Sequence, residues 1–310
     1  MAEMALSVCN AAAKDAAAFV AREEERYRRQ IRDVAEQITA GGVCLLLLAG
    51  PSASGKTTTA NLLADALRAG GHRCEVVSLD DFYRRPSDPA YPRLPDGTRD
   101  FECVESLELP LLAACLSDIL AGRPFSVPHF DFRLEDRAEK GRSYEPLTDG
   151  CVIAEGLHAL NPLITDALPR EKVLRLFVSL STNLTDDAGA RMLSGKKMRF
   201  VRRLVRDSLY RNASAERTYR LWRNVLAGEE KFLYPFRGRA DLYFDTFHAY
   251  EPGVMRAKAL PLLAELPQDD PTIAAVTETL SRAMPVAESL VPPTSLLREF
   301  LAGGVYDALY

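Results

Sequence analysis

One stretch constrains this chain of 310 residues more than any other, and it runs from Leu45 to Thr59. An apolar run ends at Gly50, four residues follow, and Gly-Lys-Thr then precedes apolar residues at helical spacing. This is the phosphate-loop (P-loop) pattern G-x-x-x-x-G-K-[ST], and it stands between a strand pattern and a helix pattern as the motif requires. The alternative is a glycine- and serine-rich turn that binds nothing.

Each residue type in the pattern has a physical role in holding a polyphosphate. The two glycines allow a tight turn that brings backbone N–H groups to phosphate oxygens, and the following helix presents unpaired N–H groups to the same anion. Lys56 is expected to neutralise the outer phosphates, and the Thr57 hydroxyl to help hold Mg²⁺. The predicted ATP-binding residues are Gly50, Ser52, Ala53, Ser54, Gly55, Lys56, Thr57 and Thr58.

Composition excludes several other classes of protein. The formal net charge of −4 argues against nucleic acid as the main partner. No apolar stretch is long enough to span a bilayer, and the first residues lack a secretory signal, so we expect a cytoplasmic protein without a membrane partner. The six cysteines form no C-x-x-C pair and are typical of buried thiols in a reducing compartment.

Helix and strand patterns alternate along the chain, which predicts an α/β fold with a doubly wound, mainly parallel sheet. A first helix is expected from about residue 12 to 38. Short strands around 125–144 predict a small antiparallel appendage beside the ligand crevice, and the proline-rich stretch 84–99 predicts a long loop. The predicted buried strands begin near residues 43, 74, 151, 173 and 242.

The same patterns divide the chain into three predicted segments. Residues 1–40 are expected to form an N-terminal helical segment, residues 41–265 the P-loop domain, and residues 266–310 a C-terminal helical extension. The apolar tail 291–300 is expected to dock on the body of the protein or on a partner subunit of a homo-oligomer.

Carboxylates follow two of the predicted strands. Asp80 and Asp81 end one strand and Glu155 ends another. Side chains at the carboxyl edge of a parallel sheet face the ligand crevice, and a strand-end acid is the expected partner of Mg²⁺ in a P-loop protein. We expect the strand of Asp80 to lie beside the P-loop strand. The alternative for this aspartate is a helix cap or a turn.

A stripe of arginines marks the predicted helix at 196–207. Arg199, Arg202, Arg203 and Arg206 follow the spacing i, i+3, i+4 and i+7, so they share one face. On an acidic protein such a stripe suggests a surface that faces an anion, and a salt-bridged face is the alternative.

These parts are those that phosphoryl transfer needs, because that reaction depends on positioning and charge neutralisation more than on covalent chemistry. Asp80 is placed to orient an attacking hydroxyl and accept its proton. The chain has no Asn-Lys-x-Asp guanine-reading motif, which weakens a GTPase interpretation.

An ordered series of motifs resembles the uridine kinase/phosphoribulokinase family, and most closely its bacterial nucleoside kinases. In those relatives the kinase region follows a threonyl-tRNA-synthetase-like region, which this sequence lacks. The likeness runs from about Glu23 to the tail at 291–303. The motifs that carry it are Gly50–Thr57, Ser78–Tyr83, Asp100–Glu102, Phe130–Phe132, Ile153–Gly156 and Arg199–Asp207.

The resemblance implies a P-loop NTPase fold with a lid helix, and ATP and Mg²⁺ as cofactors. Asp80 would be the base for a ribose 5′-hydroxyl, and Thr57, Asp80 and Glu155 would hold the metal. Lys56 and the lid arginines Arg199, Arg202 and Arg203 would serve the transferred phosphate. The residues that would surround the nucleoside are Tyr83, Phe101, Glu102, Phe130, Asp131 and Arg206.

The sequence departs from the family pattern at three places, which leaves the acceptor open. Arg133, Leu134 and Glu135 stand where the uridine kinases have a pyrimidine-reading His, Glu102 replaces a ribose-binding Asp, and Lys197-Met198 replaces Asp-Thr before the lid. A nucleoside 5′-kinase for uridine or cytidine is the first hypothesis. The others are a kinase of another small alcohol, such as a phosphorylated sugar or pantothenate, and a non-catalytic ATP-dependent switch.

Overall fold

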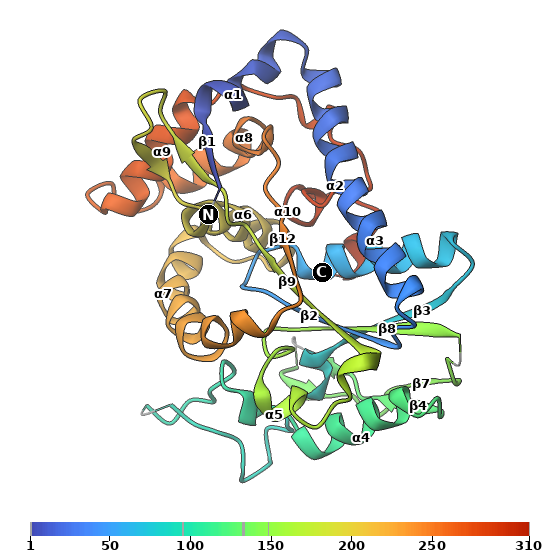
Figure 1. The fold of residues 1–310 in the computed structure, drawn as a ribbon. Coiled ribbons are helices and arrows are strands. Elements are labelled where there is room, and N and C mark those ends of the chain that lie inside the picture. The colour runs from blue at the N-terminus through green and yellow to red at the C-terminus, as the bar shows by residue number, and fades with distance from the viewer. Residues whose placement is uncertain (1, 95, 132–133, 148, 310) are drawn as a thin grey trace.

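A five-stranded parallel sheet forms the centre of the computed structural model, which describes residues 2–94, 96–131, 134–147 and 149–309 (Figure 1). All four neighbouring strand pairs are parallel, which confirms the predicted α/β fold. In spatial order the strands are β12 (Leu242–Asp245), β9 (Val173–Ser179), β2 (Leu45–Ala49), β8 (Gly150–Glu155) and β3 (Arg73–Ser78).

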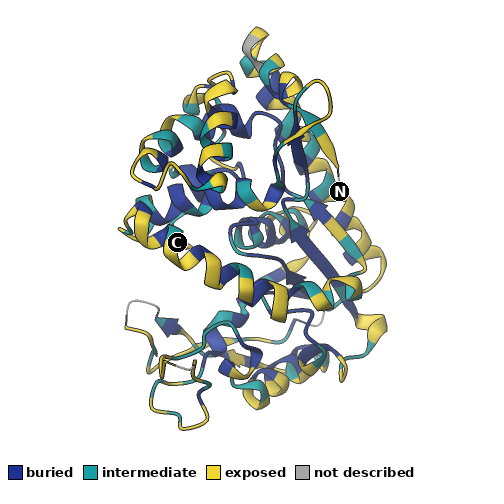
Figure 2. Ribbon diagram, turned by 90° about the vertical axis from the view of Figure 1, so that its left-hand side faces the viewer, coloured by how far each residue is buried: buried dark blue, intermediate teal, exposed yellow. Residues whose placement is uncertain are grey.

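The run of leucines in β2 is apolar on both faces because helices cover both sides of the sheet. Leu46 and Leu48 belong to one core cluster, and Leu45 and Leu47 to the other. The central strands are accordingly dark blue in the interior of Figure 2. One face carries α2 (Ala16–Ala40), α3 (Lys56–Ala69), α6 (Gly195–Tyr210) and α8 (Glu251–Ala264); the other carries α4 (Leu109–Leu120) and α5 (Pro162–Thr165).

The remaining helical elements are shorter or lie around this framework. The α-helices are α1 (Leu6–Asn10), α7 (Ala215–Phe232), α9 (Pro271–Arg282) and α10 (Arg298–Leu301). The 3₁₀ turns are η1 (Ala11–Lys14), η2 (Leu79–Phe82), η3 (Val104–Ser106), η4 (Arg170–Lys172), η5 (Tyr234–Arg239), η6 (Glu288–Leu290) and η7 (Asp307–Leu309). Within the described ranges, no helix has both the length and the apolar character needed to cross a bilayer.

Three small sheets complete the fold. Two antiparallel pairs, β4 (Phe125–Val127) with β7 (Arg142–Tyr144) and β5 (Phe130–Asp131) with β6 (Asp136–Arg137), confirm the predicted appendage. Phe132 and Arg133, which belong to one motif and one departure of the sequence analysis, lie outside the described residues. The third sheet joins β1 (Glu3–Ala5), β10 (Asn183–Thr185) and β11 (Arg191–Leu193) in that order.

The element boundaries differ from the prediction mainly near the N-terminus. Strand β1 was missed, because the segment before residue 40 was predicted to be helical throughout. The first long helix begins at Ala16, where Asp15 accepts a hydrogen bond from the backbone of Ala18, rather than near residue 12. The division of the chain into three segments stays a prediction.

The strand order corrects one expectation. The strand that leads to Asp80 was predicted to lie beside the P-loop strand, and this is wrong because β8 lies between them. Glu155, the last residue of β8, is paired in register with Leu48 of β2 on one side and with Ser78 of β3 on the other. The acid at the end of β8 therefore separates the P-loop from Asp80.

The C-terminal tail docks on the body of the protein. Leu296, Leu297, Phe300 and Leu301 are fully buried, and a Cβ placed on Gly55 would lie 2.5 Å from Cδ1 of Leu296. Helix α10 contacts α6, and Thr58 of the P-loop helix donates to Glu299 at 2.8 Å. The tail is thus part of the packing around the P-loop.

This packing predicts a large loss of stability when a buried side chain of the tail is shortened. Phe300→Ala is expected to lower the free energy of unfolding by about 3–5 kcal/mol, because it opens a cavity against α6. Val305→Ala, at a side chain 55% exposed, is the matched control and should change stability by less than about 0.5 kcal/mol. Denaturant unfolding measures both. Equal small effects would show that the tail does not contribute to the core.

Candidate active site

The P-loop connects β2 to α3 in a conformation that only its glycines allow. Gly55 has φ +87°, in the left-handed region, and a Cβ on Gly50 would lie 2.1 Å from the carbonyl oxygen of Val178. The Oγ of Ser54 is buried and has no partner in the described part of the chain. Lys56 donates from Nζ to the carbonyl of Pro51 at 3.2 Å. A buried hydroxyl left unpaired in such a turn is what an anion-binding loop leaves for its ligand.

A buried ion pair holds the start of this loop. Arg199 donates to both carboxylate oxygens of Glu229 at 2.8 and 2.7 Å, and the two side chains are 1% and 0% exposed. The same guanidinium donates to the carbonyl of Ser52 at 2.8 Å, while Glu229 accepts the Ser52 N–H at 2.8 Å. Arg199 of α6 and Glu229 of α7 therefore bind both backbone polar groups of Ser52 in the P-loop.

A second buried pair holds the end of the loop. Arg202 is bound at both ends of its guanidinium by Glu251, at 2.5 and 2.8 Å, with neither side chain exposed. Its Nη1 lies 3.4 Å from the carbonyl of Ser54, which also accepts from Thr246 at 2.8 Å. For Arg199 and Arg202 the geometry is that of the salt-bridged alternative, and their lid role stays a prediction.

The other arginines of the stripe share a single carboxylate. Asp207 lies 3.3 Å from Arg203, 2.8 Å from Arg206 and 3.7 Å from Arg211. Arg203 also donates to the hydroxyl of Ser52 in the P-loop at 2.8 Å. Three guanidinium groups around one carboxylate leave an excess of positive charge beside the loop, which suits an anionic ligand.

Glu155 lies beside the start of the P-loop helix. Its Oε1 accepts from Thr57 at 3.4 Å and from Ser78 at 3.2 Å. Burial raises the pKa of Glu155 from 4.5 to about 7, with Asp80 adding to the shift and Lys56 opposing it. The positive charge of Lys56 therefore does not fully compensate for the water that this carboxylate loses on burial.

Asp80, on η2, lies near Lys56 and Glu155. Burial raises the pKa of Asp80, and the positive charge of Lys56 opposes that shift. Asp80 in turn raises the pKa of Glu155 and of Glu102, so the three acids lie near one another. The neighbouring Asp81 has a structural role, since it binds Arg142 at 2.8 Å and His129 at 3.1 Å in the appendage. The cap of η2 is Ser78, which accepts from the N–H of Asp80 at 3.4 Å.

The oxygen donors at this edge fit a magnesium ion. Hard carboxylate and hydroxyl oxygens are the ligands that Mg²⁺ takes, usually with waters and substrate phosphates completing its shell. Asp80 and Glu155 supply two carboxylates with raised pKa values, and Thr57 and Ser78 supply hydroxyls. No three His, Cys, Asp or Glu side chains of the described residues converge on one metal position.

The predicted acceptor side is an aromatic cluster. The ring of Tyr83 lies 5.6 Å from that of Phe101 and 5.3 Å from that of Phe130, and its hydroxyl donates to the carbonyl of Phe101 at 2.8 Å. Tyr83 and Phe130 are buried, while Phe101 and Asp131 are half-buried. Asp131 accepts from the N–H of Leu134 at 3.3 Å, on the appendage.

Glu102 links the aromatic cluster to the charged part of the site. Its side chain packs on Gly228 of α7, where a Cβ would lie 2.9 Å from Oε2. Burial raises the pKa of Glu102 to about 7, Arg203 opposes the shift, and Glu229 and Asp80 add to it. Arg206, by contrast, is bound to Asp207 and is 8% exposed, so its predicted contact with the acceptor stays a prediction.

Sequence reasoning missed several residues of this pocket. Ser78 begins the Ser78–Tyr83 motif but was given no role, and Arg211, which follows no motif, is signalled only by the end of a helix. His158 is 2% exposed, its ring lies 6.2 Å from that of Phe232, and neither ring nitrogen has a partner among the described residues. Burial lowers the pKa of His158 to about 4, so it is neutral at pH 7. Its position three residues after Glu155 was the available signal.

Comparison with known proteins agrees with this geometry. The sequence pattern of the Phosphoribulokinase / Uridine kinase family matches residues 45–250, which is two thirds of the chain and includes the P-loop, Asp80 and Glu155. The chain belongs to this family.

Individual relatives share about a third or less of their residues with this chain. The chain is 32% identical to a uridine kinase of Deinococcus deserti over 171 residues, which are 54% of this chain and 70% of that protein. It is 26% identical to a uridine kinase of Staphylococcus epidermidis over 63% of this chain and 84% of that one. A solved structure of a possible uridine kinase from Bacillus stearothermophilus has a TM-score of 0.43 and 20% identity, and covers 71% of this chain and 100% of that one.

The uncompensated charge of Glu155 predicts a pH dependence of stability. Because its pKa is raised to about 7 in the fold, the proton on Glu155 stabilises the protein below pH 4.5, and this contribution is lost as the pH rises towards 7. Without metal, Glu155→Gln should therefore be more stable than the wild type at pH 8, by on the order of 1–3 kcal/mol. The difference should disappear near pH 4.5.

Thermal unfolding of both proteins between pH 4.5 and 8, with and without Mg²⁺, measures this effect. Added Mg²⁺ should stabilise the wild type at pH 8 more than the variant. Parallel pH profiles for the two proteins would contradict the assignment of a raised pKa to Glu155.

Proposed function

We propose that the protein is an ATP- and Mg²⁺-dependent phosphotransferase that acts on the 5′-hydroxyl of a nucleoside, most specifically uridine or cytidine. Membership of the family supports a kinase with a small substrate. The observation that carries the proposal is the convergence of Lys56, Asp80 and Glu155 near the P-loop. Burial raises the pKa of both acids, Lys56 opposes both shifts, and Asp80 adds to the shift of Glu155.

Asp80 is proposed to orient the acceptor hydroxyl and to accept its proton. Burial raises the pKa of this carboxyl, which makes it a better proton acceptor than an exposed aspartate. The positive charge of Lys56 opposes this shift and favours the ionised form of Asp80 that can accept the proton. The alcohol oxygen can then attack the terminal phosphate in line with the leaving group. The proton moves from the 5′-oxygen to an Oδ of Asp80 as the bond to phosphorus forms and the bond to ADP breaks.

Positive charge beside the P-loop is proposed to balance the transferred phosphate. Lys56 lies at the loop, and Arg203 reaches it through the hydroxyl of Ser52. Arg206 and Arg211 add to the surplus around Asp207. Mg²⁺ held by Thr57, Asp80 and Glu155 would supply the further charge neutralisation that phosphates require.

The aromatic cluster is proposed to exclude water from the transfer. Tyr83 and Phe130 are buried beside Asp80, and Phe101 packs on Tyr83, so an acceptor that lies against them keeps solvent away from the phosphate. Without such exclusion, water would compete with the alcohol as the nucleophile.

A panel of acceptors tests the proposal. Uridine, cytidine, adenosine and guanosine are incubated with ATP and Mg²⁺, and ADP release is compared with a reaction that lacks any acceptor. Turnover that depends on a pyrimidine nucleoside is expected. Acceptor-independent hydrolysis, or ATP binding without turnover, would favour a non-catalytic switch instead.

A second candidate is a kinase of a different small alcohol. Glu102, which stands in place of the ribose-binding Asp of the uridine kinases, packs its longer side chain against Gly228 of α7. Phosphorylated sugars and pantothenate therefore form a second arm of the same assay. Turnover with one of them, and none with nucleosides, would select this candidate.

The two adjacent aspartates provide a matched pair of variants. Asp80→Asn should lower kcat at least about 1,000-fold and leave ATP affinity within about threefold, because it removes the proton acceptor but not the P-loop. Asp81→Asn should lower thermal stability, since Asp81 holds Arg142 and His129, but should change kcat by less than about tenfold. Steady-state kinetics and ATP titration measure both. An Asp80→Asn enzyme with normal turnover would rule out Asp80 as the base.

A further inference from the structure

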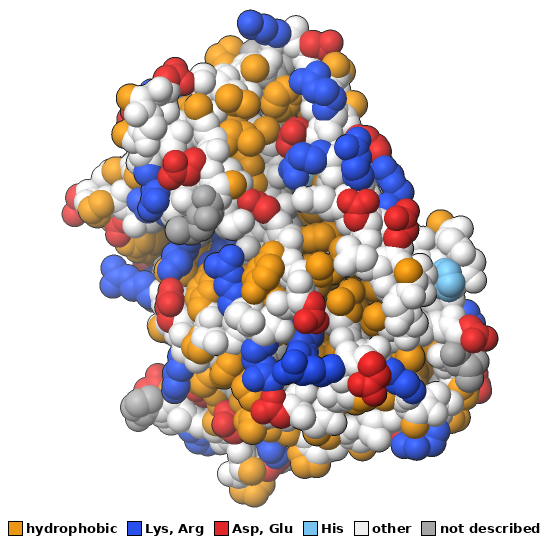
Figure 3. All heavy atoms as spheres, viewed as in Figure 1, with side chains coloured by type: hydrophobic (Ala, Val, Ile, Leu, Met, Phe, Trp, Pro, Cys, Tyr) orange, Lys and Arg blue, Asp and Glu red, His pale blue; other side chains and the backbone are white. Residues whose placement is uncertain are grey.

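A second concentration of arginines lies away from the P-loop, around a hollow of about 250 Å³. Arg175 on β9, Arg170 on η4 and Arg239 on η5 line it together with Gly238, Ala240 and Asp241. We call this cavity, with its three arginine side chains, the arginine hollow. Figure 3 shows basic side chains gathered near the middle of the face that carries η5 and β9.

Arg175 is the unusual member of the arginine hollow. It occupies a strand position between Val173 and Phe177, whose side chains belong to the apolar core on that face, and it is only 7% exposed. Its Nε is buried without an acceptor, and no hydrogen bond or ion pair of its guanidinium is found within the described residues. A largely buried guanidinium with an unpaired donor is costly, and a ligand in the hollow that accepts from this guanidinium would offset that cost.

The surrounding charges do not neutralise it. Asp241 is the one acid among the lining residues, and its carboxylate accepts the backbone N–H of Arg175 at 2.9 Å instead of its side chain. Arg239 is bound through Nη2 to Asp166 and Thr165, while its Nε is also buried without a partner. Arg170 is exposed at the rim. Three guanidinium groups thus face two carboxylates, and two of the three present unused donors.

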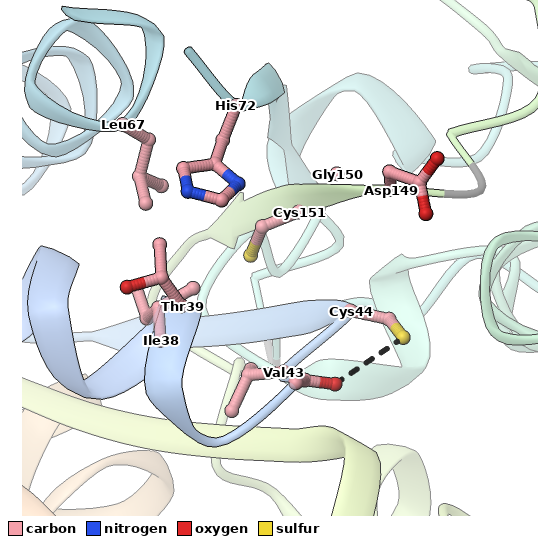
Figure 4. Close-up of a pocket in the computed structure, with 10 residues that line it drawn as sticks. Ile38, Thr39, Val43, Cys44, Leu67, His72, Asp149, Gly150 and Cys151 are labelled. Carbon is pink, nitrogen blue, oxygen red and sulfur yellow. Dashed lines mark hydrogen bonds between the residues drawn. The ribbon is translucent and has the colours of Figure 1, made fainter. Parts of the chain in front are cut away.

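Another hollow of similar size has a different chemistry. It measures about 260 Å³ and lies at the opposite end of the sheet from the P-loop, where Cys44 directly precedes β2 and Cys151 is near the start of β8. Figure 4 shows it lined by aliphatic side chains, thiols, His72 and Asp149, with no guanidinium group. An anion would therefore be drawn to the arginine hollow and not to this one.

We propose that the arginine hollow binds the phosphate group of a small phosphorylated molecule, or inorganic phosphate itself. A guanidinium offers paired N–H donors that match phosphate oxygens, and three of them around one hollow can satisfy a tetrahedral anion. The site is distinct from the P-loop. It is also independent of the proposed kinase activity, because none of its residues lies in the catalytic pocket.

Phosphate titration of the full-length Lys56→Ala protein tests this site, because that substitution weakens phosphate binding at the P-loop. Isothermal titration with inorganic phosphate should show one saturable site. Adding Arg175→Gln or Arg170→Gln should weaken binding at least tenfold. Arg220→Gln, at a side chain 70% exposed on α7, is the matched control and should leave binding unchanged.

Two further measurements separate a ligand site from a structural role. Without phosphate, Arg175→Gln should unfold at the same or a higher temperature, because it removes an unpaired buried charge, and it should lose the thermal shift that phosphate gives. If Arg175→Gln does not fold, the phosphate titration of Arg170→Gln, at an exposed side chain, decides whether the site binds phosphate. Tighter binding of uridine monophosphate than of phosphate, lost in the same variants, would identify a phosphorylated metabolite, and equal affinity would identify free phosphate. No saturable binding, or binding that both substitutions leave intact, would overturn the proposal.

Discussion

Two buried guanidinium–carboxylate pairs determine the shape of the phosphate loop. Arg199 with Glu229 binds the backbone N–H and carbonyl of Ser52, and Arg202 with Glu251 lies against the carbonyl of Ser54. Removing one partner of such a pair leaves an uncompensated buried charge and costs about 3–5 kcal/mol, whereas the intact pair adds little net stability. The two pairs therefore contribute by positioning the loop. Without them, the backbone groups of Ser52 and Ser54 would be free to find other hydrogen-bond partners.

This arrangement separates two tasks among arginines that share one helix face. Those nearest to the start of α6 are neutralised one to one and lie inside the fold, so they shape the loop. Arg203, Arg206 and Arg211 share the single carboxylate of Asp207, so they supply the field that an anion experiences. Asp80 and Glu155 have raised pKa values, because the positive charge of Lys56 does not offset the burial of these two carboxyls. A polyphosphate would balance the positive charge of these arginines, and a divalent cation bound to it would balance the negative charge of the two carboxylates.

Local signals in the sequence predicted much of this site, and long-range pairing explains what they missed. The P-loop and the strand-end acids are recognisable because each motif is continuous and adjoins its own strand. The partners of Arg199 and Arg202 lie 30 and 49 residues further along the chain, and no spacing rule connects them. The position of β8 between β2 and β3 is likewise a property of the sheet as a whole, because a buried apolar strand fits equally well beside either neighbour.

The central claim is that one edge of the sheet holds a triphosphate, a metal ion and an acceptor alcohol at once. A crystal structure with a non-hydrolysable ATP analogue, Mg²⁺ and uridine is the most direct measurement. The account predicts the terminal phosphate at Lys56, the metal bound by Thr57 and Glu155, and the 5′-hydroxyl within hydrogen-bonding distance of Asp80. A nucleoside bound with that hydroxyl turned away from Asp80, or a metal remote from Glu155, would contradict it.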